Sequence, residues 1–394
     1  YQGDYVRDMA QQMKAAHGAQ YVRPAEAVVA GTPGIPPAER ADDEAKRQRE
    51  DHLDALIRNA KDLLGPDWAY VHQHALAEQL ADGRNDLEEF GVHFDVWFSE
   101  KALFDTGLVA RCVDLLEKKG HLYEQDGAKW FKSTAFGDEK DRVVQRENGI
   151  YTYFASDIAY HLNKFERGFD KIINIWGADH HGYIPRVKGA VQALELDADK
   201  LQIALVQFAV LYRNGQKASM STRSGEFVTL RELRKEVGND ACRFFYALRK
   251  SDQHLDFDLD LAKSQTNENP VYYIQYAHAR VCSVIGQWEQ AGGKESELGE
   301  ANLALLDSPR ELALANRLGE YPEVIETAAR DLAPHQIAFY LKDLAADFHT
   351  WYNAERMLID DIALRDARVA MAAAVRQVIR SGMAILGVSC PASM

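Results

Sequence analysis

The stretch that decides the fold runs from Asp170 to Arg223 and reads DKIINIWGADHHGYIPRVKGAVQALELDADKLQIALVQFAVLYRNGQKASMSTR. Apolar residues at 172–176 and 201–211 predict two strands, and the apolar spacing over 183–194 predicts a helix between them. We expect the second strand to end at an Asn214-Gly215 turn. A strand, a helix and a strand in this order predict a right-handed βαβ unit of a parallel sheet.

Two polar loops follow the expected strands, one at 177–182 and the other at 219–225. Ligands of parallel α/β sheets bind at the carboxyl ends of the strands. We therefore expect both loops to face the same crevice and to carry ligand-binding residues.

Several motifs in this unit and after it resemble, in the same order, those of one family. They are Gly177-Ala-Asp-His-His-Gly-Tyr183, Met220-Ser-Thr-Arg-Ser-Gly225, Asp240-Ala-Cys-Arg-Phe-Phe-Tyr246, His254-Leu-Asp-Phe-Asp-Leu-Asp-Leu261, Asn267-Glu-Asn-Pro270 and Tyr272-Tyr-Ile-Gln-Tyr-Ala-His-Ala-Arg280. Together they resemble the second half of bacterial arginyl-tRNA synthetases, and the likeness covers nearly the whole chain. The resemblance implies an α/β part followed by an all-α part: the second half of a class I Rossmann-like parallel sheet with an insertion, then an anticodon-binding helical bundle.

We expect three parts along the chain. Residues 1–150 are expected to form the remainder of the catalytic domain with its insertion, residues 151–235 the second half of the nucleotide-binding domain, and residues 236–394 the helical bundle. The family's His-x-Gly-His signature occurs nowhere in these residues. We therefore expect the chain to be an incomplete portion of the enzyme, inactive by itself.

Composition agrees with an ordinary globular protein of 394 residues and a formal net charge of −14. This negative charge disfavours indiscriminate binding of nucleic acids, but it leaves room for a tRNA recognised through local patches. The four cysteines have no Cys-x-x-Cys spacing, which disfavours a zinc site or a disulfide framework and fits a reducing cytoplasm. A membrane-spanning helix needs about 20 apolar residues, and no uninterrupted apolar run in the sequence approaches that length.

The loop after the first strand holds Asp179, His180 and His181, for which three interpretations stand. The group could bind a metal, although it lacks a third ligand at helical spacing, or it could be a purely structural polar turn. The resemblance implies a third role, in which these residues and Gly177 bind ATP, with His180 also near the arginine. Glycine would let the nucleotide approach the backbone closely.

The second loop departs from the family's usual Lys-Met-Ser-Lys signature, because uncharged residues occupy both lysine positions. The resemblance implies that Met220 and Ser221 contact ATP. Arg223 is then the expected phosphate contact and Lys217 a second candidate, so Arg223, Lys217 and Ser221 are the expected catalytic residues. A surface loop without a role is the alternative.

Tyr153 and Asp157 are the pair expected to hold the arginine side chain. A buried carboxylate is a matched partner for a guanidinium, which donates two parallel hydrogen bonds to it. The resemblance implies this role for a Tyr and an Asp at this spacing. The alternative is that Asp157 only stabilises the start of a helix, which we expect over 157–165 with Ser156 as its cap.

Aromatic residues near the carboxyl end are the expected tRNA contacts. Asn269 and Pro270 predict the start of a helix, and one stripe of that helix combines aromatic side chains with an arginine. Such a stripe is more often simply buried, but the resemblance implies stacking on RNA bases. The expected tRNA-binding residues are Tyr273, Tyr276, Arg280, Tyr340, Tyr352, Asn353 and Met394.

These expectations describe an arginine–tRNA ligase. The resemblance implies ATP-dependent activation of L-arginine, with Mg²⁺ as the counter-ion of ATP, and transfer to an arginine tRNA by an enzyme that is monomeric when intact. We expect no other metal site and no membrane partner. A non-catalytic tRNA-binding fragment is one rival, and a synthetase for another amino acid is a second. The isolated cysteines disfavour a cysteinyl enzyme, which would need a zinc-binding thiol.

The remaining expected elements are read from local pattern. They are helices at 1–18, 42–64 and 103–118, a strand at 94–98, a hairpin at 123–131 around Asp126-Gly127, a short strand at 152–154, and an acidic-apolar alternation at 255–261.

Overall fold

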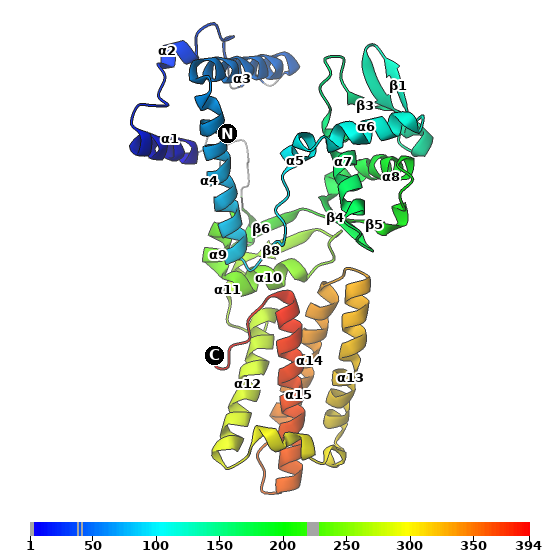
Figure 1. Cartoon of the computed structure of the whole chain (residues 1–394). Helices are drawn as coiled ribbons and strands as arrows, with labels where there is room; N and C mark the ends of the chain where they lie inside the picture. Colours follow the sequence, from blue (N-terminus) through cyan, green and yellow to red (C-terminus); the bar gives the residue numbers. More distant parts are fainter. Residues whose placement is uncertain (1–3, 38, 41, 219–227) are drawn as a thin grey trace. The chain divides into compact units, whose positions relative to one another are not determined.

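The structure is a computed structural model that describes residues 4–37, 39–40, 42–218 and 228–394 (Figure 1). The chain divides into two compact units. The first contains residues 1–93 and 219–231, and the second contains residues 94–218 and 232–394.

The first unit is helical. It contains α1 (Asp4–His17), α2 (Ala25–Val28), α3 (Asp43–Leu64) and α4 (Asp67–Glu89). The expected helix at 1–18 is confirmed over Asp4–His17, since residues 1–3 lie outside the described residues, and the helix expected at 42–64 is confirmed by α3. The Asp42 side chain caps α3 by accepting a hydrogen bond from the Ala45 amide. Ala45 is also the one side chain that these four helices bury.

The second unit begins with the elements of the expected insertion. They are α5 (Glu100–Asp105), α6 (Leu108–Lys118), β1 (Leu122–Gln125), β2 (Ala128–Phe131), η1 (Ser133–Phe136) and β3 (Arg142–Gln145). The hairpin at Asp126-Gly127 is confirmed, with φ of 51° and 75°. The expected helix at 103–118 is interrupted at Gly107, where φ is 71°. The expected strand at 94–98 is wrong, because among the described residues this segment is not part of a strand, and Phe94 and Trp97 are exposed.

The βαβ unit is confirmed. β4 (Ile172–Gly177) pairs in parallel with β5 (Leu201–Val206), and η2 (Ala178–Tyr183) and α8 (Ile184–Ala193) connect them. Gly177 lies beside Val206, so both strands end at one edge. Ile172, Val187, Val191 and Leu201 are buried together between the helix and the two strands.

The apolar run at 201–211 forms two strands rather than one. After β5, the Gln207 amide donates to the Ser251 carbonyl at 2.7 Å, and the chain enters a second sheet. There β6 (Ala209–Arg213) lies between β7 (Gln216–Lys217) and β8 (Leu255–Asp258). The expected Asn214-Gly215 turn joins β6 to β7, with φ of 52° and 72°.

α7 (Tyr153–Glu166) packs on α6 and α8 and contributes Phe154, Ile158 and Leu162 to one hydrophobic core of this unit. The expected strand at 152–154 is wrong, because the helix begins at Tyr153. Ser156 is therefore not its cap; its hydroxyl donates to Glu100 at 2.7 Å. Asp157 lies in the second turn of α7, which weakens the alternative that it serves only the helix start.

The carboxyl-terminal part is helical, as expected. It contains α9 (Leu230–Val237), α10 (Asn239–Ala247), α11 (Leu259–Lys263), α12 (Pro270–Gln290), η4 (Glu295–Glu300), η5 (Leu303–Leu305), α13 (Pro309–Arg330), α14 (His335–Ala354) and α15 (Ile362–Leu386). The Asn269 side chain caps α12. In Figure 1 the long helices α12 to α15 lie side by side, and α15 packs on the other three.

By length and composition alone, α15 is the one helix among the described residues that is apolar enough to cross a membrane. In this fold it is a helix of the bundle, and its side chains Val369, Val375 and Ile379 are buried. Such core helices pass the same test of length and composition.

Candidate functional site

Asp157 is a half-buried carboxylate on the inner part of α7. Burial raises the pKa of its carboxyl group above the ordinary value, and a hydrogen bond from the Tyr183 hydroxyl, 2.5 Å away, opposes that rise. No ion pair joins Asp157 to a cationic side chain in the described parts of the chain. The site therefore holds an anion that is partly removed from water and has a phenol as its partner.

Tyr153 lies four residues before Asp157, so the two side chains emerge on the same face of α7. The Tyr153 side chain is 81% exposed. The structure thus brings the two expected arginine-binding residues together through helical spacing, although the sequence pattern had placed Tyr153 in a strand.

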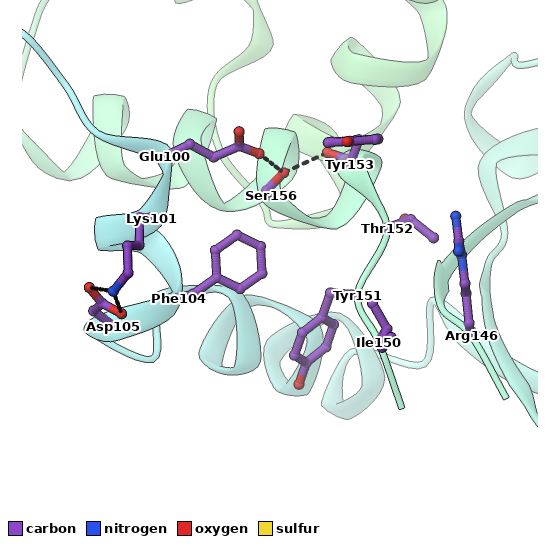
Figure 2. Close-up of a pocket in the computed structure, with 10 residues that line it drawn as sticks. All are labelled: Glu100, Lys101, Phe104, Asp105, Arg146, Ile150, Tyr151, Thr152, Tyr153 and Ser156. Atoms are coloured by element: carbon purple, nitrogen blue, oxygen red, sulfur yellow. Dashed lines mark hydrogen bonds and ion pairs between the residues drawn. The ribbon is translucent and has the colours of Figure 1, made fainter. Parts of the chain in front are cut away.

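A cavity of about 590 Å³ opens at the start of α7; Tyr153 lines it, and Asp157 is not among its lining residues (Figure 2). This volume lies in the range of small-ligand sites. Figure 2 shows Tyr153 and Ser156 on one side of it, with the Glu100 carboxylate accepting a hydrogen bond from Ser156. The other lining residues are Lys101, Phe104, Asp105, Arg146, Ile150, Tyr151 and Thr152.

A buried polar chain supports α7 behind Asp157. The His161 imidazole donates from Nδ1 to the Asp157 carbonyl oxygen at 2.7 Å and accepts at Nε2 from the Asn174 amide at 2.7 Å. Burial lowers the pKa of His161 to about 4, so this imidazole is neutral near pH 7. The Lys164 ammonium donates to the Asn174 side-chain oxygen at 2.8 Å.

Our sequence reasoning missed His161 and Asn174. One signal was available: Asn174 stands at an inward-facing position of β4, two residues after the buried Ile172, where an apolar residue is usual.

A second ionic group lies near Tyr183. The Arg186 guanidinium carbon is 4.6 Å from the Tyr183 ring centroid, and its Nε donates to the buried Asp138 carboxylate at 3.1 Å. Arg142 donates to the same carboxylate from Nε at 2.8 Å and from Nη2 at 2.9 Å. These hydrogen bonds, that from Arg142 first, hold the pKa of Asp138 well below its usual range.

The expected ATP-binding loop follows β4 at the edge where β4 and β5 end. A methyl group at Gly177 would come within 2.5 Å of Oδ1 of Asp179, so a larger residue there would displace that carboxylate. Asp179, His180 and His181 are exposed on η2, and His180 Nε2 lies 3.8 Å from Asp179 Oδ2. Within the described ranges, no cluster of three His, Cys, Asp or Glu side chains is placed to hold a metal.

Lys217 is exposed on β7, which belongs to the second sheet rather than to the β4–β5 sheet. Met220, Ser221 and Arg223 lie outside the described residues, so the expectation that the two loops share one crevice stays a prediction.

An arginine lies between two aromatic rings in the bundle. The Arg280 guanidinium carbon is 4.4 Å from the Tyr276 ring centroid and 4.9 Å from that of Tyr352. Its Nη1 also donates to Nδ1 of His349 at 3.1 Å, and the His349 ring is 4.6 Å from that of Tyr273. The structure thus brings together four expected tRNA-binding residues from α12 and α14. His349, which the sequence reasoning missed, is 6% exposed and supports them from a buried position.

The remaining three expected tRNA contacts differ in exposure. Asn353 is exposed near the end of α14, and Met394 is 53% exposed. Tyr340 is 5% exposed, and its hydroxyl donates to the Arg317 carbonyl oxygen at 2.7 Å. The expected role of Tyr340 is therefore corrected: a ring packed in the core offers no face to a base.

Two family models match this chain. Residues 74–263 match the model described as tRNA synthetases class I (R), catalytic domain. Residues 274–394 match the DALR anticodon binding domain.

Curated relatives agree over the whole length of the chain. The arginine–tRNA ligase of Dechloromonas aromatica is 83% identical over 394 residues, and that of Aromatoleum aromaticum is 74% identical over 395 residues. Each alignment covers 100% of this chain and 67% of the relative, so the chain spans about two thirds of the length of these relatives.

Solved structures have the same fold. A putative arginyl tRNA synthetase from Campylobacter jejuni matches with a TM-score of 0.80 and 30% identity, covering 100% of this chain and 76% of that chain. An arginyl-tRNA synthetase of Thermus thermophilus matches with a TM-score of 0.69 and 22% identity, covering 90% and 68%, and supports the fold alone. With a class I catalytic domain, a DALR domain and relatives of this identity, the chain belongs to the arginine–tRNA ligase family.

Proposed function

We propose that this part of the ligase binds the guanidinium of L-arginine at Asp157, ATP at the loop after β4, and the arginine tRNA on the aromatic surface of α12 and α14. The observation that carries the proposal is the half-buried Asp157 carboxylate without a cationic partner among the described residues. A buried charge without a counter-charge is unfavourable, and a cationic ligand supplies that counter-charge.

The guanidinium of arginine suits this site by shape as well as charge. Tyr183 donates to Oδ2 of Asp157, which leaves Oδ1 and the remaining lone pairs of the carboxylate to accept the two parallel N–H groups. A bound cation would also favour the ionised form of Asp157 and reverse the rise of its pKa. Tyr153, on the same face of α7 and lining the cavity, would cover the aliphatic part of the substrate.

ATP is proposed to lie over Gly177, with Asp179, His180 and His181 at its ribose and base. The close approach between Gly177 and Asp179 supports this placement, because a side chain at Gly177 would disturb the loop. Lys217, Met220, Ser221 and Arg223 remain the proposed phosphate contacts. Mg²⁺ is proposed to arrive with the ATP phosphates, whose charge it would neutralise.

The tRNA is proposed to stack its exposed bases on Tyr273, Tyr276 and Tyr352, with Arg280, Asn353 and Met394 at the edge of the surface. The position of Arg280 over two rings supports the proposal, because stacked aromatic and guanidinium planes are the usual platform for single-stranded bases. We propose that the enzyme works as a monomer in the cytoplasm, with the three parts of this chain at 1–150, 151–235 and 236–394.

The test compares arginine with citrulline, which has nearly the same shape and no positive charge. In the complete enzyme, at the length of its relatives, we expect arginine-dependent exchange of pyrophosphate into ATP and no measurable exchange with citrulline. Comparable kcat/KM values for the two amino acids would refute a site built around the charge of Asp157.

A further inference from the structure

Two carboxylates are connected to Tyr183: Asp157 accepts from its hydroxyl, and Asp138 binds Arg186, which lies over its ring. The Asp138 side chain is 3% exposed and is bound by two guanidinium groups, those of Arg142 and Arg186. Asp157 has no ion pair with a described cation. Arg142 and Arg186, whose guanidinium lies over the Tyr183 ring, are therefore both held by the carboxylate that is not proposed to bind substrate.

Arg186 is placed where it could serve either carboxylate. It belongs to the first turn of α8 and lies over the ring of Tyr183, whose hydroxyl contacts Asp157. The Arg186 guanidinium also acts on the Tyr183 hydroxyl, since its charge opposes the rise in the pKa of that phenol. Tyr183 contacts both the Arg186 guanidinium and Asp157, and an arginine side chain has a long flexible stem, so a change of rotamer could bring the guanidinium to Asp157.

Asp138 holds Arg186 in its observed position. The carboxylate accepts from Arg186, from both nitrogens of Arg142 and from the Glu139 amide at 2.8 Å, so its own orientation is fixed by several donors. A charge-assisted hydrogen bond to a buried carboxylate is strong. In the structure, Arg186 accordingly binds Asp138 and makes no ion pair with Asp157.

We propose that Asp138 is a positioning residue that sequesters the Arg186 guanidinium and so keeps Asp157 open to the guanidinium of the substrate. Without Asp138, Arg186 becomes an internal competitor that occupies Asp157 in place of arginine. This inference rests on the proposed function, because it takes Asp157 as the substrate anchor.

The first test is Asp138→Asn in the complete enzyme. Arg186 is then free to pair with Asp157, and the KM for arginine should rise roughly tenfold or more with kcat nearly unchanged, as for a close charge pair that must be displaced. Adding Arg186→Met should restore the KM toward the wild-type value, because methionine covers the rings without a charge. Asp141→Asn is the matched control, since Asp141 lies in the same loop and accepts from Thr134 instead of a guanidinium.

The pH dependence of kcat/KM distinguishes competition by Arg186 for Asp157 from a general loosening of the structure. Among the described groups, the Tyr183 hydroxyl, the Glu100 carboxylate and the Lys164 ammonium affect the pKa of Asp157. His161 binds the carbonyl oxygen of Asp157, and Arg186 affects the pKa of Tyr183. In the wild type, kcat/KM for arginine should fall on acidification through the raised pKa of Asp157. In Asp138→Asn the new ion pair lowers that pKa, so the acid limb should move to lower pH.

Several outcomes would overturn the inference: an unchanged KM in Asp138→Asn, a raised KM that Arg186→Met does not restore, or an acid limb that stays in place. Thermal unfolding checks that each variant is folded. If Asp138→Asn does not fold, the same measurement is made on the double variant Asp138→Asn, Arg142→Met. In that variant Arg186 is the one guanidinium of the pair that has lost its carboxylate, because Arg142 is gone. An unchanged arginine KM in Asp157→Asn would instead refute the proposed anchor itself.

Discussion

Asp157→Asn removes one charge from the proposed anchor and changes its shape very little. The asparagine side chain can still accept from Tyr183, so the hydrogen bond seen in the structure is retained. The substrate guanidinium, by contrast, loses a charged partner in a half-buried site. Truncating one partner of such a pair costs roughly 2 to 5 kcal/mol, which is about 30-fold to several thousand-fold in arginine affinity.

The same substitution should leave the free protein as stable or more stable. Burial raises the pKa of Asp157 above its ordinary 3.8, so the folded protein favours the protonated carboxyl. The stability linked to that proton is present below the unfolded pKa and is lost as the pH rises through the folded pKa. At pH 7 the ionised Asp157 therefore opposes folding, and removing its charge should raise the midpoint of thermal unfolding or leave it unchanged.

Two measurements on the complete enzyme check this prediction. Titration calorimetry gives the arginine affinity, and thermal unfolding with and without arginine gives the stabilisation by ligand, which should vanish in the variant. Asp170→Asn is the matched control, because Asp170 is exposed at the end of the segment after α7. Arginine binding at wild-type strength in Asp157→Asn, or a variant that unfolds at a much lower temperature, would show that the reasoning is wrong.

Three further predictions concern other parts of the chain. Tyr276→Ala should weaken binding of the arginine tRNA by about 1 to 3 kcal/mol in a filter-binding assay, while the exposed Tyr5→Ala should leave it unchanged. Gly189→Val should lower the free energy of unfolding in urea by roughly 1 to 3 kcal/mol, because a Cβ at Gly189 would lie 2.6 Å from Cβ of Phe136. Equal stability of the variant and the wild type would show that η1, which contains Phe136, moves freely. Asp138 has a lowered pKa, so its carboxylate stabilises the fold above its unfolded pKa, and this stability is lost as the pH falls through the folded pKa. The difference in unfolding temperature between the wild type and Asp138→Asn should therefore shrink below about pH 3.8. A difference that does not change with pH would contradict this prediction.

The sequence predicted the elements whose periodicity is strong and local. The strand, helix and strand of 172–206 have clear apolar spacing, and the turns at Asp126-Gly127 and Asn214-Gly215 use residues that tolerate positive φ. The division of 201–211 between two sheets could not be seen, because both strands are apolar and a two-residue link leaves no break in the pattern. At 152–154 the aromatic residues favour a strand by local propensity. The helix forms instead because it allows the side chains of α7 to pack in the core.

The site was predictable where spacing alone defines it. Tyr153 and Asp157 lie on one helical face, and so do Tyr273, Tyr276 and Arg280. Contacts between distant segments were not predictable from spacing. Arg280 stacks on Tyr352 because α12 packs against α14 in the bundle. Tyr340 is buried because α14 packs against α13, the helix that contains Arg317.

The scarcity of buried side chains in α1 to α4 has a consequence for hydrogen exchange. Amide protons in a helix exchange when the helix opens locally, and the free energy of opening depends on the apolar contacts that are lost. α1, α2 and α4 bury no residue and α3 buries only Ala45, whereas α12, α14 and α15 bury residues along their whole lengths. In deuterated buffer the amides of α1 to α4 should therefore exchange long before those of the bundle, and proteases should cut these four helices first.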